Sequence, residues 1–174
     1  MVRKLGILLG AAGLAACSTT TPTALAPTPP RTPVEVQILA INDFHGNLET
    51  PSEPVKVGQS DGSALTARLG GAAQLASALA KARVGHANTI TVAAGDLIGA
   101  SPLTSAYFLD EPTIDAMNLL GRSLASVGNH EFDKGSSELL RMQAGGCAKY
   151  TQRIPCGLEP FNGARFEYLA GNVN

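Results

Sequence analysis

The sequence contains no tryptophan, only three tyrosines and five phenylalanines, and no basic stripe interleaved with aromatic residues. Its 13 lysines and arginines are balanced by 14 acidic residues, which gives a formal net charge of −1. A surface that binds nucleic acid usually shows as a clustered basic patch, so this composition argues against a nucleic-acid polymer as partner. Beyond the first 16 residues there is no long apolar run, and we therefore predict no transmembrane helix in the remaining chain.

The first 16 residues have the pattern of a secretory signal. Arg3 and Lys4 give a positive start, residues 5–14 form an apolar run too short to span a bilayer, and two alanines follow. Residues 14–17 (LAAC) resemble the lipobox of bacterial lipoproteins, in which the cysteine becomes the lipidated first residue after cleavage. We predict a lipid anchor on Cys17 and a location in the bacterial cell envelope, on the periplasmic or cell-surface side. The alternative is an ordinary secretory signal followed by an incidental cysteine.

Residues 17–33 are predicted to form a tether behind that anchor. Residues 18–33 contain six threonines and five prolines and almost nothing that can pack. Such a segment cannot bury enough apolar surface to offset the entropy that it would lose on ordering. A proline-rich spacer that rises about 3.1 Å per residue would hold a domain up to roughly 50 Å from a membrane.

Cysteine is scarce, with three residues in the chain. Lipidation of Cys17 leaves Cys147 and Cys156, and in an oxidising compartment this even pair can close one small loop. Two cysteines without a nearby histidine fall short of the four ligands of a structural zinc site, which makes zinc the poorer interpretation. We predict a disulfide between Cys147 and Cys156, with free thiols as the alternative.

From residue 34 onward, apolar strands alternate with helical patterns. Strands are predicted where apolar and β-branched residues gather, over residues 34–41, 89–94, 123–127 and 166–174. Helices are predicted over residues 70–84, in a segment that begins at Pro112, and from residue 134. The polar stretch 48–63, rich in glycine, proline and serine, is predicted to be a loop. This alternation indicates a layered α/β fold.

Three of the predicted strands are followed directly by side chains that can bind metals. Asp43 and His45 follow the first strand, Asp96 follows the second, and Asn129 and His130 follow the third. Ligands of open α/β sheets bind outside the carboxyl ends of the strands. At strand spacing, Asp43 and His45 lie on one side of the backbone, where both can face one ion. Carboxylate oxygens together with imidazole suit Zn²⁺, Mn²⁺ or Fe. Any one of these motifs alone could also be interpreted as a polar loop that binds no metal.

The motifs stand in a fixed order: INDFHG at 41–46, AGD at 94–96 and GNHEFD at 128–133. This series resembles the motifs of the calcineurin-like metallophosphoesterase superfamily. The residues within each motif are similar to those of the periplasmic 5′-nucleotidase and UDP-sugar hydrolase family. Residues 99–103 and 114–118 also fit the spacing of that family. The resemblance covers residues 34–174, and it implies the N-terminal part of a layered α/β/β/α sandwich that is incomplete in this chain.

The resemblance implies a site with two divalent ions at the strand ends. In that site Asp43 and His45 bind the first ion, Asp96 bridges both ions, and Asn129 binds the second. Two ions roughly 3.5–4 Å apart stabilise both the attacking and the leaving oxygen of an in-line displacement. The metal could be Zn, Mn or Fe, and the sequence does not choose among them.

The resemblance also implies a catalytic role for His130, which is not expected to bind metal. His130 would stabilise the phosphoryl oxygens or protonate the leaving alkoxide, and Asp133 would hold its ring in orientation. A structural histidine beside the site is the alternative for His130. Glu131 is expected to point away from the site in a strand-like register, and we interpret it as structural.

One departure from the family pattern limits the expected activity. The family completes its site with later histidines, whereas this sequence has three in total, His45, His86 and His130. The separate C-terminal domain that binds the substrate is also missing, so we expect residues 34–174 to be the first portion of a longer enzyme and to be inactive alone.

The predicted function is metal-dependent hydrolysis of phosphoric esters, with nucleoside 5′-monophosphates or related nucleotides as substrates of the longer enzyme. Two alternatives within the superfamily are a nucleotide-sugar hydrolase and a cyclic-nucleotide phosphodiesterase. An alternative of another class is a non-catalytic, truncated lipoprotein. The sequence leaves the oligomeric state open.

Overall fold

A computed structural model describes residues 32–121 and 123–171, and the folded unit begins at Val34. The predicted signal, the lipidation site at Cys17 and nearly all of the predicted tether lie outside the described residues, as do the last three residues of the predicted fourth strand. Within the described ranges, no helix is both long and apolar enough to cross a membrane.

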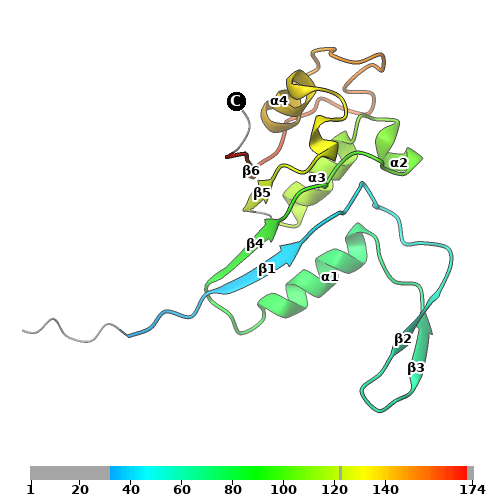
Figure 1. The fold of residues 1–174 in the computed structure, drawn as a ribbon, viewed down its shortest axis with the longest axis vertical. Coiled ribbons are helices and arrows are strands. Elements are labelled where there is room, and N and C mark those ends of the chain that lie inside the picture. The colour runs from blue at the N-terminus through cyan, green and yellow to red at the C-terminus, as the bar shows by residue number, and fades with distance from the viewer. Residues whose placement is uncertain (1–31, 122, 172–174) are drawn as a thin grey trace, which may run out of the picture. The chain divides into compact units, whose positions relative to one another are not determined.

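Four strands form a parallel sheet in the order β1-β4-β5-β6 (Figure 1). The strands are β1 (Gln37–Ile41), β4 (Thr89–Ala93), β5 (Leu124–Ser126) and β6 (Glu167–Leu169). Because all four run in the same direction, the loops that follow β1, β4 and β5 leave the sheet at one edge. The predicted α/β class is confirmed, and each strand is shorter than its predicted range.

Helices connect the strands. They are α1 (Ala72–Arg83), α2 (Leu103–Ala106), α3 (Glu111–Leu119) and α4 (Ser136–Ala144), with a short 3₁₀ turn η1 (His130–Phe132). Pro112 lies in the first turn of α3, where its missing N–H costs no helical hydrogen bond. Figure 1 shows α1 on the β1 side of the sheet and α4 on the β6 side.

The hydrophobic core lies between the sheet and these helices. Its most deeply buried side chains are Leu97, Ile114, Met117, Met142 and Phe166. Burying a side chain of this size contributes roughly 1.5–3 kcal/mol to stability.

A buried ion cluster ties α3 to α4 beside this core. The guanidinium of Arg141 donates to Glu111 at 2.7 Å and to both carboxylate oxygens of Glu138 at 2.7 and 3.0 Å. All three side chains are buried, so removing one partner would leave an uncompensated charge.

The prediction of a continuous loop over residues 48–63 is wrong. Strand β2 (Val55–Gly58) lies within it and pairs antiparallel with β3 (Ala64–Ala67). The hairpin turn is closed by Asp61, whose Oδ1 accepts hydrogen bonds from both the N–H and the hydroxyl of Ser63 at 2.9 and 2.6 Å. The strands are four residues long and mostly exposed, so they lack the apolar run on which the prediction of a strand depends.

Candidate functional site

The loops after β1 and β4 are joined by backbone hydrogen bonds beyond the last paired residues of the two strands. The N–H of His45 donates to the carbonyl of Asp96 at 3.0 Å, and the N–H of Gly46 donates to that of Leu97 at 3.0 Å. Asp43 and His45 are thereby held beside Asp96.

Four non-glycine residues of these loops have left-handed backbone conformations. Their φ angles are 49° at Asp43, 46° at His45, 50° at Asp96 and 47° at Ala100. Such conformations cost about 1–3 kcal/mol each and cluster at functional sites, where the surrounding structure holds them. Three of the four, Asp43, His45 and Asp96, are residues that the sequence assigned to metal binding.

The loops after β4 and β5 approach too closely for side chains between them. A Cβ atom on Gly95 would lie 2.7 Å from the amide nitrogen of Gly128, and Gly95 has a φ of 104°. A Cβ atom on Gly128 would collide with the carboxylate of Asp96. Glycine at both positions therefore lets Asp96 lie directly against the loop that carries Asn129 and His130.

The ring of His45 is oriented by the backbone of a third segment. Its Nδ1 lies 2.9 Å from the carbonyl oxygen of Gly99. A carbonyl only accepts, so Nδ1 carries a proton, and in the neutral ring Nε2 keeps its lone pair. Nε2 lies 3.8 Å from Oδ1 of Asp43, whose side chain is 56% exposed. The pair thus presents one nitrogen and one carboxylate toward the same space.

His130, the first residue of η1, and Asp133, which directly follows η1, form a hydrogen-bonded pair. Nδ1 of His130 lies 2.8 Å from Oδ2 of Asp133. This hydrogen bond is the main reason why the pKa of His130 is raised above its ordinary value, against the lowering effect of desolvation. The ring of His130 also meets the ring of His45 edge to face, with centroids 4.9 Å apart.

Three side chains converge closely enough to share one ion. His45, Asp96 and His130 each offer a ligand atom, and these atoms lie within 4.8 Å of one another. The group includes His130, which the sequence assigned to catalysis rather than to metal binding. Asn129 is exposed and directly precedes η1. The predicted residues therefore come together at the sheet edge, and their roles as ligands stay predictions.

No family model matches the chain. An uncharacterised protein in the pqq-V 5′ region of Acinetobacter calcoaceticus is 45% identical over 168 residues, which cover 95% of this chain and 82% of that protein. A probable 5′-nucleotidase of Treponema pallidum is 37% identical over 106 residues, 60% of this chain and 17% of that protein. The solved NAD nucleotidase of Haemophilus influenzae matches with a TM-score of 0.53 at 28% identity, over 68% of this chain and 22% of that chain. Over the matched residues the chain is similar to 5′-nucleotidases.

The 5′-nucleotidases are hydrolases, and the likeness to them supports the predicted enzyme class. The chain covers a short part of the named nucleotidases. It spans most of the Acinetobacter protein but 17% of the Treponema nucleotidase and 22% of the Haemophilus one.

The sequence did not anticipate how Glu131 is placed. Its strand-like register was predicted wrongly, because residues 130–132 form a 3₁₀ turn that directs the carboxylate inward. Glu131 is 2% exposed and accepts backbone hydrogen bonds from both neighbouring loops. The structural role predicted for Glu131 stays a prediction, and its carboxylate lies inside the site's framework.

Asp110 is a second residue that the sequence did not single out. Its fully buried carboxylate accepts hydrogen bonds from Lys134 at 2.8 Å, from Ser105 at 2.8 Å and from the N–H of Gly99 at 3.4 Å. Burial alone would raise the pKa of Asp110, but the bonds from Lys134 and Ser105 outweigh it and lower that pKa. Asp110 thus supports Gly99, the residue whose carbonyl orients His45, and only tertiary contacts reveal this.

The cysteines predicted to pair lie away from these loops in the sequence. Cys147 and Cys156 form a disulfide. The N–H of Cys156 donates to both carboxylate oxygens of Glu111 at 3.0 and 3.1 Å, which connects the cross-linked loop to the ion cluster of Arg141.

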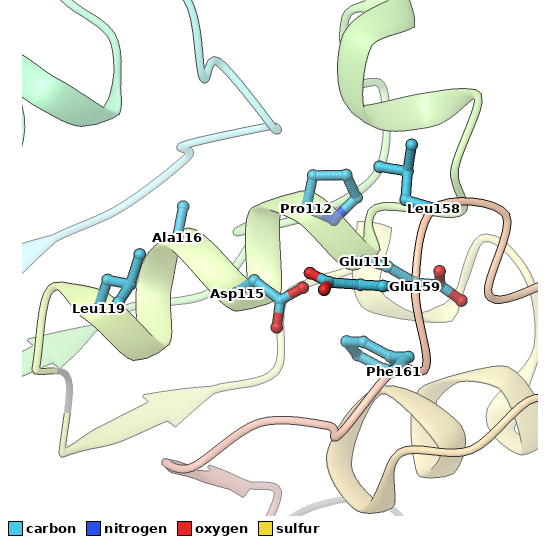
Figure 2. Close-up of a pocket in the computed structure, with 8 residues that line it drawn as sticks. All are labelled: Glu111, Pro112, Asp115, Ala116, Leu119, Leu158, Glu159 and Phe161. Atoms are coloured by element: carbon cyan, nitrogen blue, oxygen red, sulfur yellow. The ribbon is translucent and has the colours of Figure 1, made fainter.

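A pocket of about 260 Å³ opens on the surface of α3. Figure 2 shows its side chains gathered between α3 and residues 158–161, with Asp115 and Glu159 among them. The pKa of Asp115 is raised by burial and by the negative charges of Glu159 and Glu111. The pocket shares no lining residue with the strand-end loops, so it is not part of the candidate site.

Proposed function

We propose that the strand-end loops of this chain bind two divalent cations and hydrolyse phosphoric esters. The observation that carries the proposal is the convergence of His45, Asp96 and His130 within 4.8 Å, with Asp43 at the rim. We assign Asp43 and His45 to the first ion, Asp96 to both, and Asn129 to the second. Zn, Mn and Fe all suit these donors.

The residues present fit such a site. His45 has one ring nitrogen bonded to a carbonyl and the other free, which is the usual arrangement of a metal-binding histidine. Oδ1 of Asp96 accepts the N–H of His130 at 3.0 Å, and the second carboxylate oxygen remains for an ion. Oxygen and imidazole donors without thiolates disfavour Cu(I) and iron–sulfur clusters, which need soft ligands.

The chemistry that divalent cations would supply here is Lewis-acid polarisation of the phosphoryl oxygens. His130 lies beside the same space and, when protonated, donates a hydrogen bond to a phosphoryl oxygen or a proton to the leaving alkoxide. Asp133 fixes the ring and favours its protonated form, which is why the raised pKa of His130 matters. An acid with a pKa near the working pH is the more effective catalyst.

We propose nucleoside 5′-monophosphates or related nucleotides as the substrates. The names of the Treponema and Haemophilus relatives support a nucleotide. Nucleotide sugars and cyclic nucleotides are the alternatives, because the same strand-end residues could serve each of them. A non-catalytic lipoprotein is the alternative of another class.

We also propose that the protein is anchored in the bacterial envelope through a lipid on Cys17. The sequence of residues 1–17 supports the anchor, and residues 18–33 suit a spacer. The disulfide between Cys147 and Cys156 supports an oxidising compartment, because such bonds are rare in the cytosol of ordinary bacteria.

The test is release of phosphate by the native protein purified from its source cells, from 5′-AMP, UDP-glucose and a cyclic nucleotide, with Mn²⁺ or Zn²⁺ and after chelation. We expect metal-dependent release from 5′-AMP that Asp96→Asn abolishes. The matched control is His86→Ala, because His86 lies in an exposed turn and pairs with Glu35 at 3.4 Å, remote from the loops. Release from another substrate would reassign the specificity. A folded chain that releases no phosphate with either metal supports the non-catalytic alternative.

A further inference from the structure

The sheet does not hold the loops after β4 and β5 together. The ladder between the two strands pairs Val92 with Leu124 and Ala93 with Ala125, and it ends there. Gly95 follows β4 and Gly128 follows β5, and the two segments come close together at these glycines. Among the described residues, no backbone-to-backbone hydrogen bond joins residues 95–97 to residues 128–131. Yet these two loops carry Asp96, Asn129 and His130, whose separation decides whether they can act together.

The carboxylate of Glu131 bridges this gap. Oε2 accepts the N–H of Asp96 at 2.9 Å and the N–H of Gly128 at 2.6 Å, while Oε1 accepts the N–H of Leu97 at 2.8 Å. Hydrogen bonds to an ionised acceptor are roughly twice as strong as neutral ones. One side chain therefore replaces the missing ladder with three charge-assisted bonds, two to the β4 loop and one to its own.

A second contact runs in the opposite direction. Oδ1 of Asp96 accepts the N–H of His130 at 3.0 Å. Each loop thus offers a carboxylate to the backbone of the other, and the two contacts together fix the distance and the rotation of one loop relative to the other. The same contacts hold Asp96 in its left-handed conformation, with a φ of 50°.

The chemistry of these contacts requires a carboxylate of this length. An ionised carboxylate only accepts, which suits three converging N–H donors. Glutamine at position 131 would place an NH₂ group against at least one of these donors. Aspartate would keep the charge but is one methylene shorter. A buried charge without such partners would cost several kcal/mol, so the three N–H groups also explain why Glu131 can be buried at all.

We infer that Glu131 is a positioning residue of the active site: it sets the spacing between the loop of Asp96 and the loop of Asn129 and His130. Its effect on metal affinity rests on the proposed function. Its effect on the loops does not, because the three hydrogen bonds join protein groups alone.

The test compares Glu131→Gln and Glu131→Asp with Glu138→Gln in the purified full chain. Glu138 is the matched control, because its carboxylate is equally buried at 2% exposure but bonds Arg141 on its own helix. Hydrogen exchange of the metal-free proteins reports the loops through peptides that cover residues 94–98 and 126–133. Calorimetric titration with Mn²⁺ reports the affinity, and thermal unfolding reports global stability.

We expect both Glu131 variants to exchange these amides at least about tenfold faster than wild type, since each leaves buried N–H groups unsatisfied. Affinity for Mn²⁺ should fall by about 10–100-fold, which is the usual effect of removing a group that orients the metal ligands through hydrogen bonds. Glu138→Gln should lower the melting temperature and leave both readouts unchanged.

The inference is overturned if the Glu131 variants keep wild-type exchange in both peptides. It is also overturned if they lose thermal stability as Glu138→Gln does while exchange and affinity stay at the wild-type level, because Glu131 would then be a merely structural residue. A wild-type chain that binds no Mn²⁺ contradicts the proposed function, and the exchange of the metal-free proteins still decides the role of Glu131. If Glu131→Gln does not fold, Glu131→Asp is judged by the same readouts.

Discussion

Reduction of the disulfide between Cys147 and Cys156 should destabilise the protein by an amount that the length of its loop sets. The two residues are nine positions apart, and the loss of loop-closure entropy for such a loop predicts about 2.6 kcal/mol at 25 °C. Domains are stable by only about 5–15 kcal/mol, so this is a large share. For a chain of this size, about 2–4 °C per kcal/mol gives a melting temperature lower by roughly 5–10 °C.

The assay is urea unfolding and thermal unfolding of the same protein with and without a reductant, because reduction changes no side-chain volume in the way that a substitution would. A Cys147→Ser, Cys156→Ser double variant is the control, and the reductant should not change its stability. A difference below about 1 kcal/mol between oxidised and reduced wild type would refute the reasoning. It would show that the loop is already restricted in the unfolded chain without the disulfide.

Asp96→Ala should abolish metal retention and phosphate release together, because one bridging carboxylate serves both ions; activity retained in this variant, measured beside its metal content, would exclude a two-metal site. Asp133→Asn should lower the pKa of His130, because a neutral amide replaces the carboxylate that accepts its hydrogen bond. Protonated His130 is then lost at a lower pH, and the alkaline limb of the activity profile moves to lower pH. NMR titration of the His130 ring measures that pKa directly, and an unchanged value would contradict the pairing. Cys17→Ala should move the protein from the membrane fraction of the source cells to the soluble fraction, and a variant that stays membrane-bound would exclude the lipid anchor.

The placement of the site could be predicted because it follows from topology. Parallel strands bring the residues after their carboxyl ends to one edge, so Asp43, Asp96 and Asn129 had to approach one another once the strands were recognised. The alternation of apolar strands and amphipathic helices was sufficient for that recognition.

What the sequence could not show depends on contacts between distant segments. The β2–β3 hairpin has short, exposed strands, and its register is set by the turn at Asp61 rather than by an apolar pattern. Glu131 was assigned a strand-like register because a single 3₁₀ turn leaves no periodic signal. Asp110 gains its role only when Gly99 and Lys134 are brought beside it.

The most direct measurement of the central claim is anomalous diffraction from crystals of the purified chain grown with Mn²⁺. We predict an anomalous peak within bonding distance of both His45 and Asp96, at the space that their ligand atoms enclose with His130. The same peak should be absent from crystals of Asp96→Ala grown under identical conditions. Two results would contradict the proposal that this edge of the sheet is a metal-dependent hydrolase site. One is well-ordered loops with no anomalous peak among them, and the other is a peak that persists in Asp96→Ala.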